Sequence, residues 1–252
     1  MNDLVLRENK DGAAILTLNR PEKLNALSKD MVERLEQHVE AIARETKTIG
    51  LVILRGAGGN FSAGHDMTEV LAQVKAHAKP HHYVEVIDKV ANLPQPVISA
   101  VRGHCSTGAL ELALAADLIV AAESAIFCDA YARWGLTPIW GLSLRLPHRI
   151  GTSKASEMMF TCRSYSGREA HEMHLANYCF PDEQFEAEIA ALARDILANS
   201  WYSNQVDKRA LLESAALTLH DAHGLSLFKN EGLAPDALQR VTRFFKQRKT
   251  RG

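Results

Sequence analysis

The sequence has little of what marks several classes of protein. Its 252 residues include four cysteines, and no two of them form a C-x-x-C pair, so they are expected to be reduced thiols of a cytoplasmic protein. No apolar run approaches the length of a membrane span, and the first ten residues contain no signal-peptide core. The G-x-G-x-x-G fingerprint of a dinucleotide site is also missing, which argues against a redox enzyme.

The chain also lacks a large excess of charge of either sign. The formal charge is −1, so no global basic field favours binding to nucleic acid or to an anionic membrane. What the chain does have is apolar content, at 46% of residues. A chain of this length and composition can bury a full core without disulfides or metals.

Strands and helices alternate in the first 180 residues, which predicts a parallel α/β architecture. The expected elements are a hairpin within 3–19, a helix at 29–44 capped by Ser28, a loop at 75–82, a helix at 83–92 and strands at 51–54, 97–101, 118–121 and 125–127. Later residues favour helices at 152–161, 167–176 and 185–198 and one beginning near Pro235. Residues 179–182 are the expected link between a part spanning 1–180 and a helical part spanning 181–252.

One acidic side chain stands out in the segment that follows the strand at 97–101. Glu111 lies in the first turn of an otherwise apolar helix, between Leu110 and Leu112. A capping box would need Ser or Thr at position 108, which is Gly. Electrostatic stabilisation of the helix start and pairing with a buried Arg remain alternatives. A main-chain N–H at Gly108, beside a buried carboxylate, would form a coherent catalytic pair.

A second glycine-containing loop, N-F-S-A-G-H-D-M at residues 60–67, follows the strand at 51–54. It would place main-chain N–H groups near a helix start around His65. An ordinary turn with Asp66 as a helix cap is the alternative. The ring of His65 could serve as a general base, but its main-chain N–H is the favoured group.

Several segments together resemble the enoyl-CoA hydratase/isomerase (crotonase) superfamily. They are L-N-R-P-E-K-L-N-A-L (18–27), F-S-A-G-H-D (61–66), P-V-I-S-A-V-R-G (96–103), G-A-L-E-L-A-L-A-A-D (108–117), G-L-T-P-I-W-G (135–141), R-L-P-H-R-I-G (145–151) and F-K-Q-R-K (245–249). The resemblance implies a spiral of ββα units for catalysis and acyl-CoA binding in 1–180. It implies that 181–252 form a helical trimerisation region contributing to the CoA site. A homotrimer or dimer of trimers would follow.

The same resemblance implies a site for an acyl-CoA thioester. Its carbonyl would be polarised by the main-chain N–H groups of His65 and Gly108, with coenzyme A as part of the substrate and no separate cofactor. The residues implied to bind the substrate are Lys23, Leu24, Ala63, Asp66, Met67, Trp140 and Lys249. For Trp140 the alternative is core packing, and for Lys249 it is a solvated helix end.

The family pattern breaks at the second catalytic glutamate. Glu111 matches the first, but the second position falls on Tyr131. A phenol with a pKa of about 10 cannot be a resting general base at neutral pH, although it can donate or accept a hydrogen bond. Asp129 would share the face of Tyr131 if the segment is extended, and so could substitute for the missing acid. The isomerase branch usually keeps the second carboxylate, which counts against simple isomerisation.

Hydration of a 2-enoyl-CoA, with Glu111 and Tyr131 as catalytic residues, is therefore the first expectation. Decarboxylation, isomerisation and thioester hydrolysis share the enolate and stay open, as does a catalytically weak acyl-CoA-binding subunit. His171 and His174 have a spacing that could bind a metal, but residues 166–169 are typical of an ordinary helix start. No metal site is expected.

Overall fold

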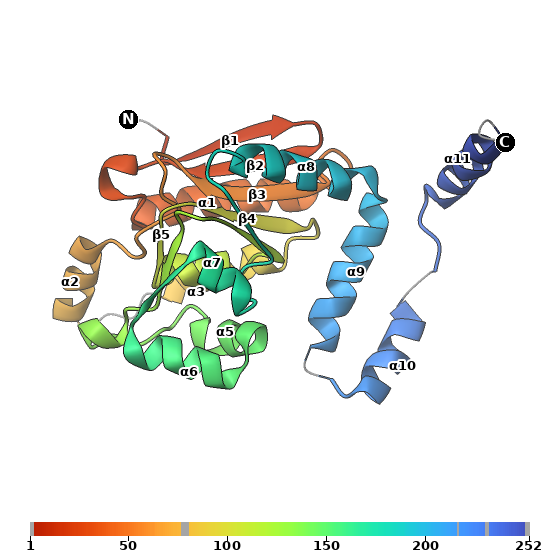
Figure 1. The fold of residues 1–252 in the computed structure, drawn as a ribbon. Helices are drawn as coiled ribbons and strands as arrows, with labels where there is room; N and C mark the ends of the chain where they lie inside the picture. The colour runs from red at the N-terminus through yellow and green to blue at the C-terminus, as the bar shows by residue number, and fades with distance from the viewer. Residues whose placement is uncertain (1–2, 77–80, 216, 230–231, 250–252) are drawn as a thin grey trace.

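Two sheets organise the computed structural model, which describes residues 3–76, 81–215, 217–229 and 232–249. Within these residues the larger sheet has six strands in the order β1-β2-β3-β4-β6-β9, and the smaller has three in the order β5-β7-β8 (Figure 1). The strands are β1 (Val5–Lys10), β2 (Ala13–Leu18), β3 (Leu51–Gly56), β4 (Val97–Val101), β5 (His104–Ser106), β6 (Leu118–Ala122), β7 (Ile126–Cys128), β8 (Ser164–Ser166) and β9 (Tyr178–Phe180).

Helices connect and cover these strands. They are α1 (Lys29–Arg44), α2 (Met67–Ala76), α3 (His81–Ala91), α4 (Gly108–Ala113), α5 (Leu142–Ile150), α6 (Thr152–Thr161), α7 (Gly167–Glu172), α8 (Phe185–Ala198), α9 (Trp201–Ser214), α10 (Leu219–Lys229) and α11 (Ala237–Lys249), with short 3-10 turns η1 (Pro21–Lys23) and η2 (Ala132–Trp134). In Figure 1 the last three helices lie to one side of the sheets. Among the described residues, no helix is both long and apolar enough to cross a bilayer.

The α/β architecture predicted from the alternation of elements is confirmed. In the larger sheet β1 and β2 form an antiparallel hairpin, and every other neighbouring pair is parallel. Helix α1 has the predicted bounds, and the Ser28 hydroxyl accepts a hydrogen bond from the Met31 N–H at 3.4 Å, as an N-cap should.

The central strands β3, β4 and β6 of the larger sheet are buried on both faces, because their side chains alternate between two apolar clusters. In β3, Leu51 and Ile53 pack toward Phe185 of α8, whereas Val52 and Leu54 face the main core. The main core also contains the apolar faces of α1, α3 and α4. The short helix α4 is thus enclosed on all sides, and each of its six residues is buried.

Several predicted boundaries are wrong. The loop expected at 75–82 begins as the end of α2, the helix whose start was expected near His65. Helix α3 starts at His81 instead of Tyr83, and residues 77–80 lie outside the described residues. Helix α7 ends at Glu172, four residues early. The expected link at 179–182 overlaps the end of β9, because Cys179 and Phe180 pair with β6. Helix α8 then packs on the sheet, and the division of the chain at residue 180 stays a prediction.

Helix α9 is attached to the sheet by two side chains. The ring of Trp201 lies on Gly50, where an added Cβ would come within 2.4 Å of the indole. Lys208 is buried, and its Nζ donates to Asp117 Oδ2 at 2.8 Å and to the carbonyl of Gln95 at 3.1 Å. Asp117 also accepts the N–H of Val97 at the start of β4. These contacts tie the helical region to the strand that leads into the loop before α4.

We expect Gly50→Ala to lower the free energy of unfolding by about 1–3 kcal/mol, because the new methyl group would overlap the Trp201 ring. Chemical denaturation monitored by circular dichroism would measure this. Gly224→Ala in α10 is the matched control, since an added Cβ there meets nothing within 4 Å and alanine favours a helix. Equal effects from the two substitutions would contradict the packing argument.

Candidate active site

The loop between β3 and α2 leaves one main-chain donor unused. Within the described residues, each N–H from Phe61 to Asp66 has an acceptor except that of His65; the acceptors are Arg102 O, His104 O, Leu24 O, Ser62 Oγ and Leu27 O. These bonds, of 2.7–3.1 Å, fix the loop on both sides. The His65 N–H is therefore held in place and available to a ligand.

A second unused donor lies at the start of α4. The N–H groups of Ser106 and Thr107 donate to Ser62 O and Cys128 O, but that of Gly108 has no acceptor in the part of the chain that the structure describes. Because a Cβ built on Gly64 would lie 3.4 Å from the Gly108 nitrogen, the two loops are in close contact there. The predicted pair of N–H donors, on His65 and Gly108, is thus carried by adjacent segments.

Glu111 is fully buried one turn into α4, and three donors hold its carboxylate. Oε1 accepts the main-chain N–H groups of Trp140 at 2.9 Å and Leu142 at 3.0 Å. Oε2 accepts the hydroxyl of Tyr131 at 2.5 Å. The partners are a phenol and two amides, so the alternative of a buried arginine pair is wrong.

Burial dominates the titration of this pair. It raises the pKa of Glu111 above its ordinary value, although the bonds from Tyr131, Leu142 and Trp140 oppose the shift. The pKa of Tyr131 is also raised, by burial and by the nearby Glu111 carboxylate. Tyr131 is therefore a neutral hydrogen-bond donor at rest.

Asp129 lies beside this pair without joining it. It is 2% exposed, and its Oδ1 accepts the main-chain N–H of Tyr131 at 3.0 Å. Burial raises the pKa of Asp129, whose charge in turn adds a minor upward effect on the pKa of Glu111. Its contact positions the Tyr131 backbone, and the idea that Asp129 replaces the missing acid stays a prediction.

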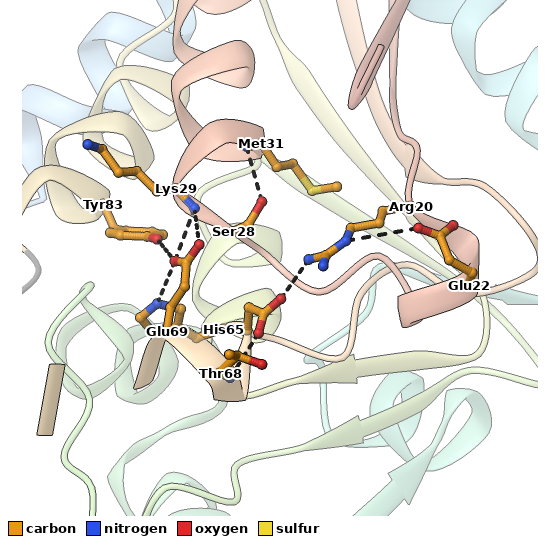
Figure 2. A network of polar contacts seen from close by, with 10 residues as sticks. Arg20, Glu22, Ser28, Lys29, Met31, His65, Thr68, Glu69 and Tyr83 are labelled. Atoms are coloured by element: carbon orange, nitrogen blue, oxygen red, sulfur yellow. Dashed lines mark hydrogen bonds and ion pairs between the residues drawn. The ribbon is translucent and has the colours of Figure 1, made fainter. Parts of the chain in front are cut away.

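A polar network around Glu69 of α2 was not predicted (Figure 2). Glu69 accepts the hydroxyl of Tyr83 at 2.7 Å and the N–H of Lys29, the first residue of α1, at 3.0 and 3.1 Å. Its Oε2 lies 3.6 Å from Nε2 of His65. Burial lowers the pKa of the His65 imidazole, which Glu69 partly offsets. Helical spacing from His65 could have revealed Glu69, but nothing in the sequence indicates its link to Tyr83.

The residues expected to bind the nucleotide end surround this loop. Ala63 donates to the carbonyl of Leu24 at 2.9 Å, next to Lys23, and Met67 is half-exposed at the start of α2. Asp66 is bound instead to Arg20 at 2.6 Å and to the N–H of Thr68 at 2.9 Å, so its carboxylate is already engaged. The side chain of Lys249 lies outside the described residues.

The pair of histidines in α7 belongs to an ordinary helix end. Ser166 and Glu169 form a capping box at its start, and Nδ1 of His171 lies 3.2 Å from the carbonyl of Ala176. His174 follows the helix in the left-handed conformation. Over the described ranges, no three His, Cys, Asp or Glu side chains gather as a candidate metal set.

The family model described as enoyl-CoA hydratase/isomerase matches residues 8–231. A probable enoyl-CoA hydratase from Mycobacterium bovis is 37% identical over 237 residues, covering 88% of this chain and 83% of the relative. A 4-chlorobenzoyl coenzyme A dehalogenase from Arthrobacter is 28% identical over 257 residues, with 92% of each chain covered.

Solved structures share the fold over nearly the whole chain. The enoyl-CoA hydratase from Bacillus anthracis superposes with a TM-score of 0.89 at 30% identity, covering 97% of this chain and 96% of the other. The enoyl-CoA hydratase from Mycobacterium tuberculosis gives a TM-score of 0.88 at 29% identity, covering 98% and 97%.

Proposed function

Because the chain belongs to the enoyl-CoA hydratase/isomerase family, we propose that it hydrates a 2-enoyl-CoA through a stabilised thioester enolate. At the coarser level it is a crotonase-family acyl-CoA enzyme. The observation that carries the finer proposal is the pair of unused N–H groups on His65 and Gly108, close to the buried carboxylate of Glu111.

The two N–H groups would bind the oxygen of the thioester carbonyl. Negative charge develops on that oxygen as the enolate forms, and fixed donors in a dry site stabilise it without having to reorganise. Removing one such donor typically costs about 10²–10³-fold in turnover. This part of the proposal uses main-chain atoms only, so it does not depend on the His65 ring.

Proton transfer would run through Tyr131 to Glu111. Three donors already bind the Glu111 carboxylate, so it is poorly placed to bind the reacting water by itself. The Tyr131 oxygen can still accept a hydrogen bond from that water. The oxygen of a water held there would bond to the β-carbon, while its proton passes to Tyr131 and the Tyr131 proton to Glu111. Returning a proton along this path to the α-carbon completes the addition of water.

Tyr131→Phe should therefore lower kcat by about 10–100-fold while KM for the acyl-CoA changes little. Since the Tyr131 bond lowers the pKa of Glu111, its removal raises that pKa further, and the acidic limb of the kcat–pH profile should move to higher pH. Steady-state kinetics measured from about pH 5 to about pH 9 would detect both effects.

Tyr165→Phe is the matched control for this substitution. Tyr165 is also buried and donates its hydroxyl to a glutamate, Glu157, at 2.8 Å, but on β8 away from the site. It should leave kcat and the pH profile unchanged. An unchanged kcat in Tyr131→Phe would contradict the relay.

A screen of purified protein against enoyl-, malonyl- and β-ketoacyl-CoAs tests the reaction itself. The highest kcat/KM should be for an enoyl-CoA. A higher value for another class would replace hydration by decarboxylation, thioester hydrolysis or another enolate reaction. Binding without turnover of any class would favour the alternative of an acyl-CoA-binding subunit.

Substrate contacts, assembly and compartment stay predictions. The proposed CoA path follows Lys23, Leu24, Ala63, Asp66 and Met67, with Lys249 at its phosphate end and Trp140 at the acyl group. A homotrimer or dimer of trimers is supported by an exposed apolar face on α11, formed by Leu238, Val241 and Phe245. Analytical ultracentrifugation would measure the assembly, and the expected location is the cytoplasm.

A further inference from the structure

Three rings from separate elements pack against one another near the unused donors. Tyr83 of α3 and Trp140 are stacked, with ring centroids 4.7 Å apart and planes 1° from parallel. The ring of His65 lies 4.8 Å from Tyr83 and 5.0 Å from Trp140. Tyr83 is 4% exposed and Trp140 1%, so both are closed to solvent.

This aromatic cluster lies directly against the proposed catalytic groups. The six-membered ring of Trp140 covers Gly108, where an added Cβ would lie 2.1 Å from Cζ3. The main-chain N–H of Trp140 holds Oε1 of Glu111. The third ring belongs to His65 itself. An acyl group bound between the donors and the carboxylate would therefore meet the Trp140 ring.

Hydrogen bonds hold the aromatic cluster in place, so displacing its rings would cost free energy. The hydroxyl of Tyr83 donates to Glu69, and Glu69 in turn accepts the first N–H of α1, as Figure 2 shows. The Glu69 side chain is 32% exposed, so this anchor is buried in part. Moving Tyr83 would break its bond to Glu69 and unstack Trp140.

We propose that the stacked pair of Trp140 and Tyr83 closes the acyl end of the site and restricts it to short acyl groups of crotonyl size. The inference rests on the proposed function, because it takes the thioester oxygen to lie at the His65 and Gly108 N–H groups. From there the α- and β-carbons would extend toward Glu111, beside the Trp140 ring. Each further methylene of a longer chain would have to displace the stack.

Binding of saturated acyl-CoAs tests this without any turnover. By calorimetry, the wild-type protein should bind butyryl-CoA at least about tenfold more tightly than decanoyl-CoA, although added methylenes normally increase affinity. Trp140→Ala should shift the ratio of the two Kd values toward decanoyl-CoA by at least about tenfold. Tyr83→Phe, which removes only the anchor to Glu69, should shift it in the same direction by less.

Phe160→Ala is the control, because that aromatic side chain is 79% exposed on α6. It should leave the ratio unchanged. The inference is overturned if wild-type protein binds decanoyl-CoA as tightly as butyryl-CoA. It is also overturned if Trp140→Ala and Tyr83→Phe both fold and leave the ratio unaltered.

Failure of the proposed reaction would look different from failure of this inference. Without hydration but with the expected Kd ratios, the short acyl site stands and the chemistry must be reassigned. If long and short enoyl-CoAs are hydrated with equal kcat/KM, the proposed reaction is supported, and the proposal that Trp140 and Tyr83 restrict the acyl group is wrong. If no acyl-CoA binds, both are wrong.

Discussion

Glu111→Gln is expected to lower turnover of the best acyl-CoA substrate by about 10²–10⁴-fold, the usual contribution of a positioned general acid–base. Glutamine has nearly the same shape and can keep bonds to the Trp140 and Leu142 N–H groups, but it cannot accept a proton. The donors on His65 and Gly108 are untouched, so the Kd of a substrate analogue should change little. Single-turnover kinetics and calorimetry would measure the two effects separately.

The same substitution should raise thermal stability at neutral pH. Burial holds the pKa of Glu111 above its ordinary value of 4.5, so on unfolding the group becomes more acidic. The unfolded chain then binds fewer protons than the folded one, and the wild-type protein loses stability as pH rises through the raised pKa. Glutamine does not titrate. Tm of the variant should exceed that of wild type at pH 7, and the gap should close below about pH 4.5.

Glu157→Gln offers a matched control. Glu157 also accepts a tyrosine hydroxyl, but its side chain is 40% exposed. Hydrogen bonds hold its pKa below the ordinary value, with Lys154 the main cause. It should keep full turnover and show no gain in Tm at pH 7. If Glu111→Gln retained turnover, the assignment of Glu111 as the proton-transferring group would be wrong.

Gly64→Ala should cause the second large loss, of about 10²–10³-fold in kcat, the effect of losing an oxyanion donor. Gly64 has φ +96°, where a Cβ is strained, and the new methyl group would lie 2.1 Å from Thr107 Oγ1 and 2.5 Å from the Ser106 carbonyl. A main-chain oxygen cannot rotate away. The two loops must separate, which moves the His65 and Gly108 N–H groups apart.

Gly59→Ala separates backbone strain from this overlap. Gly59 lies in the same loop with φ +79°, but a Cβ there meets nothing within 4 Å. Both variants should lose some stability, while kcat should fall only in Gly64→Ala. Denaturant unfolding and steady-state kinetics on both proteins would measure this. Equal losses of kcat would mean that loop strain, and not the spacing of the donors, limits the reaction.

Local patterns predicted much of the fold. Helix α1 and strand β4 have the predicted bounds, because a capping serine and a β-branched run are signals that tertiary packing did not override. The start of α2 was expected near His65, but its extent was missed because its polar and apolar residues give a weak helical period. Strand β9 was missed because three residues carry no strand period of their own. The pairing of β9 with β6 depends on residues far away in the chain.

The proposed site was predictable only in part, for a related reason. An acidic residue in an apolar helix can be recognised in the sequence, and so can the glycine three residues before it. The bond between Tyr131 and Glu111, and the anchor of Tyr83 on Glu69, join separate elements through side chains. Such contacts produce no periodic pattern in the sequence, so they can be identified only in the folded structure.

The order of strands in the larger sheet has a consequence for how the protein is made. From β1 to β9 each strand pairs with the one that precedes it in that sheet along the chain, so a strand leaving the ribosome meets a neighbour already synthesised. The His65 loop emerges after β3 and must wait for the segment ending at Gly108. Helix α8 comes later still and seals the second face. The His65 loop and the segment ending at Gly108 are therefore both synthesised before α8, the helix that covers the second face.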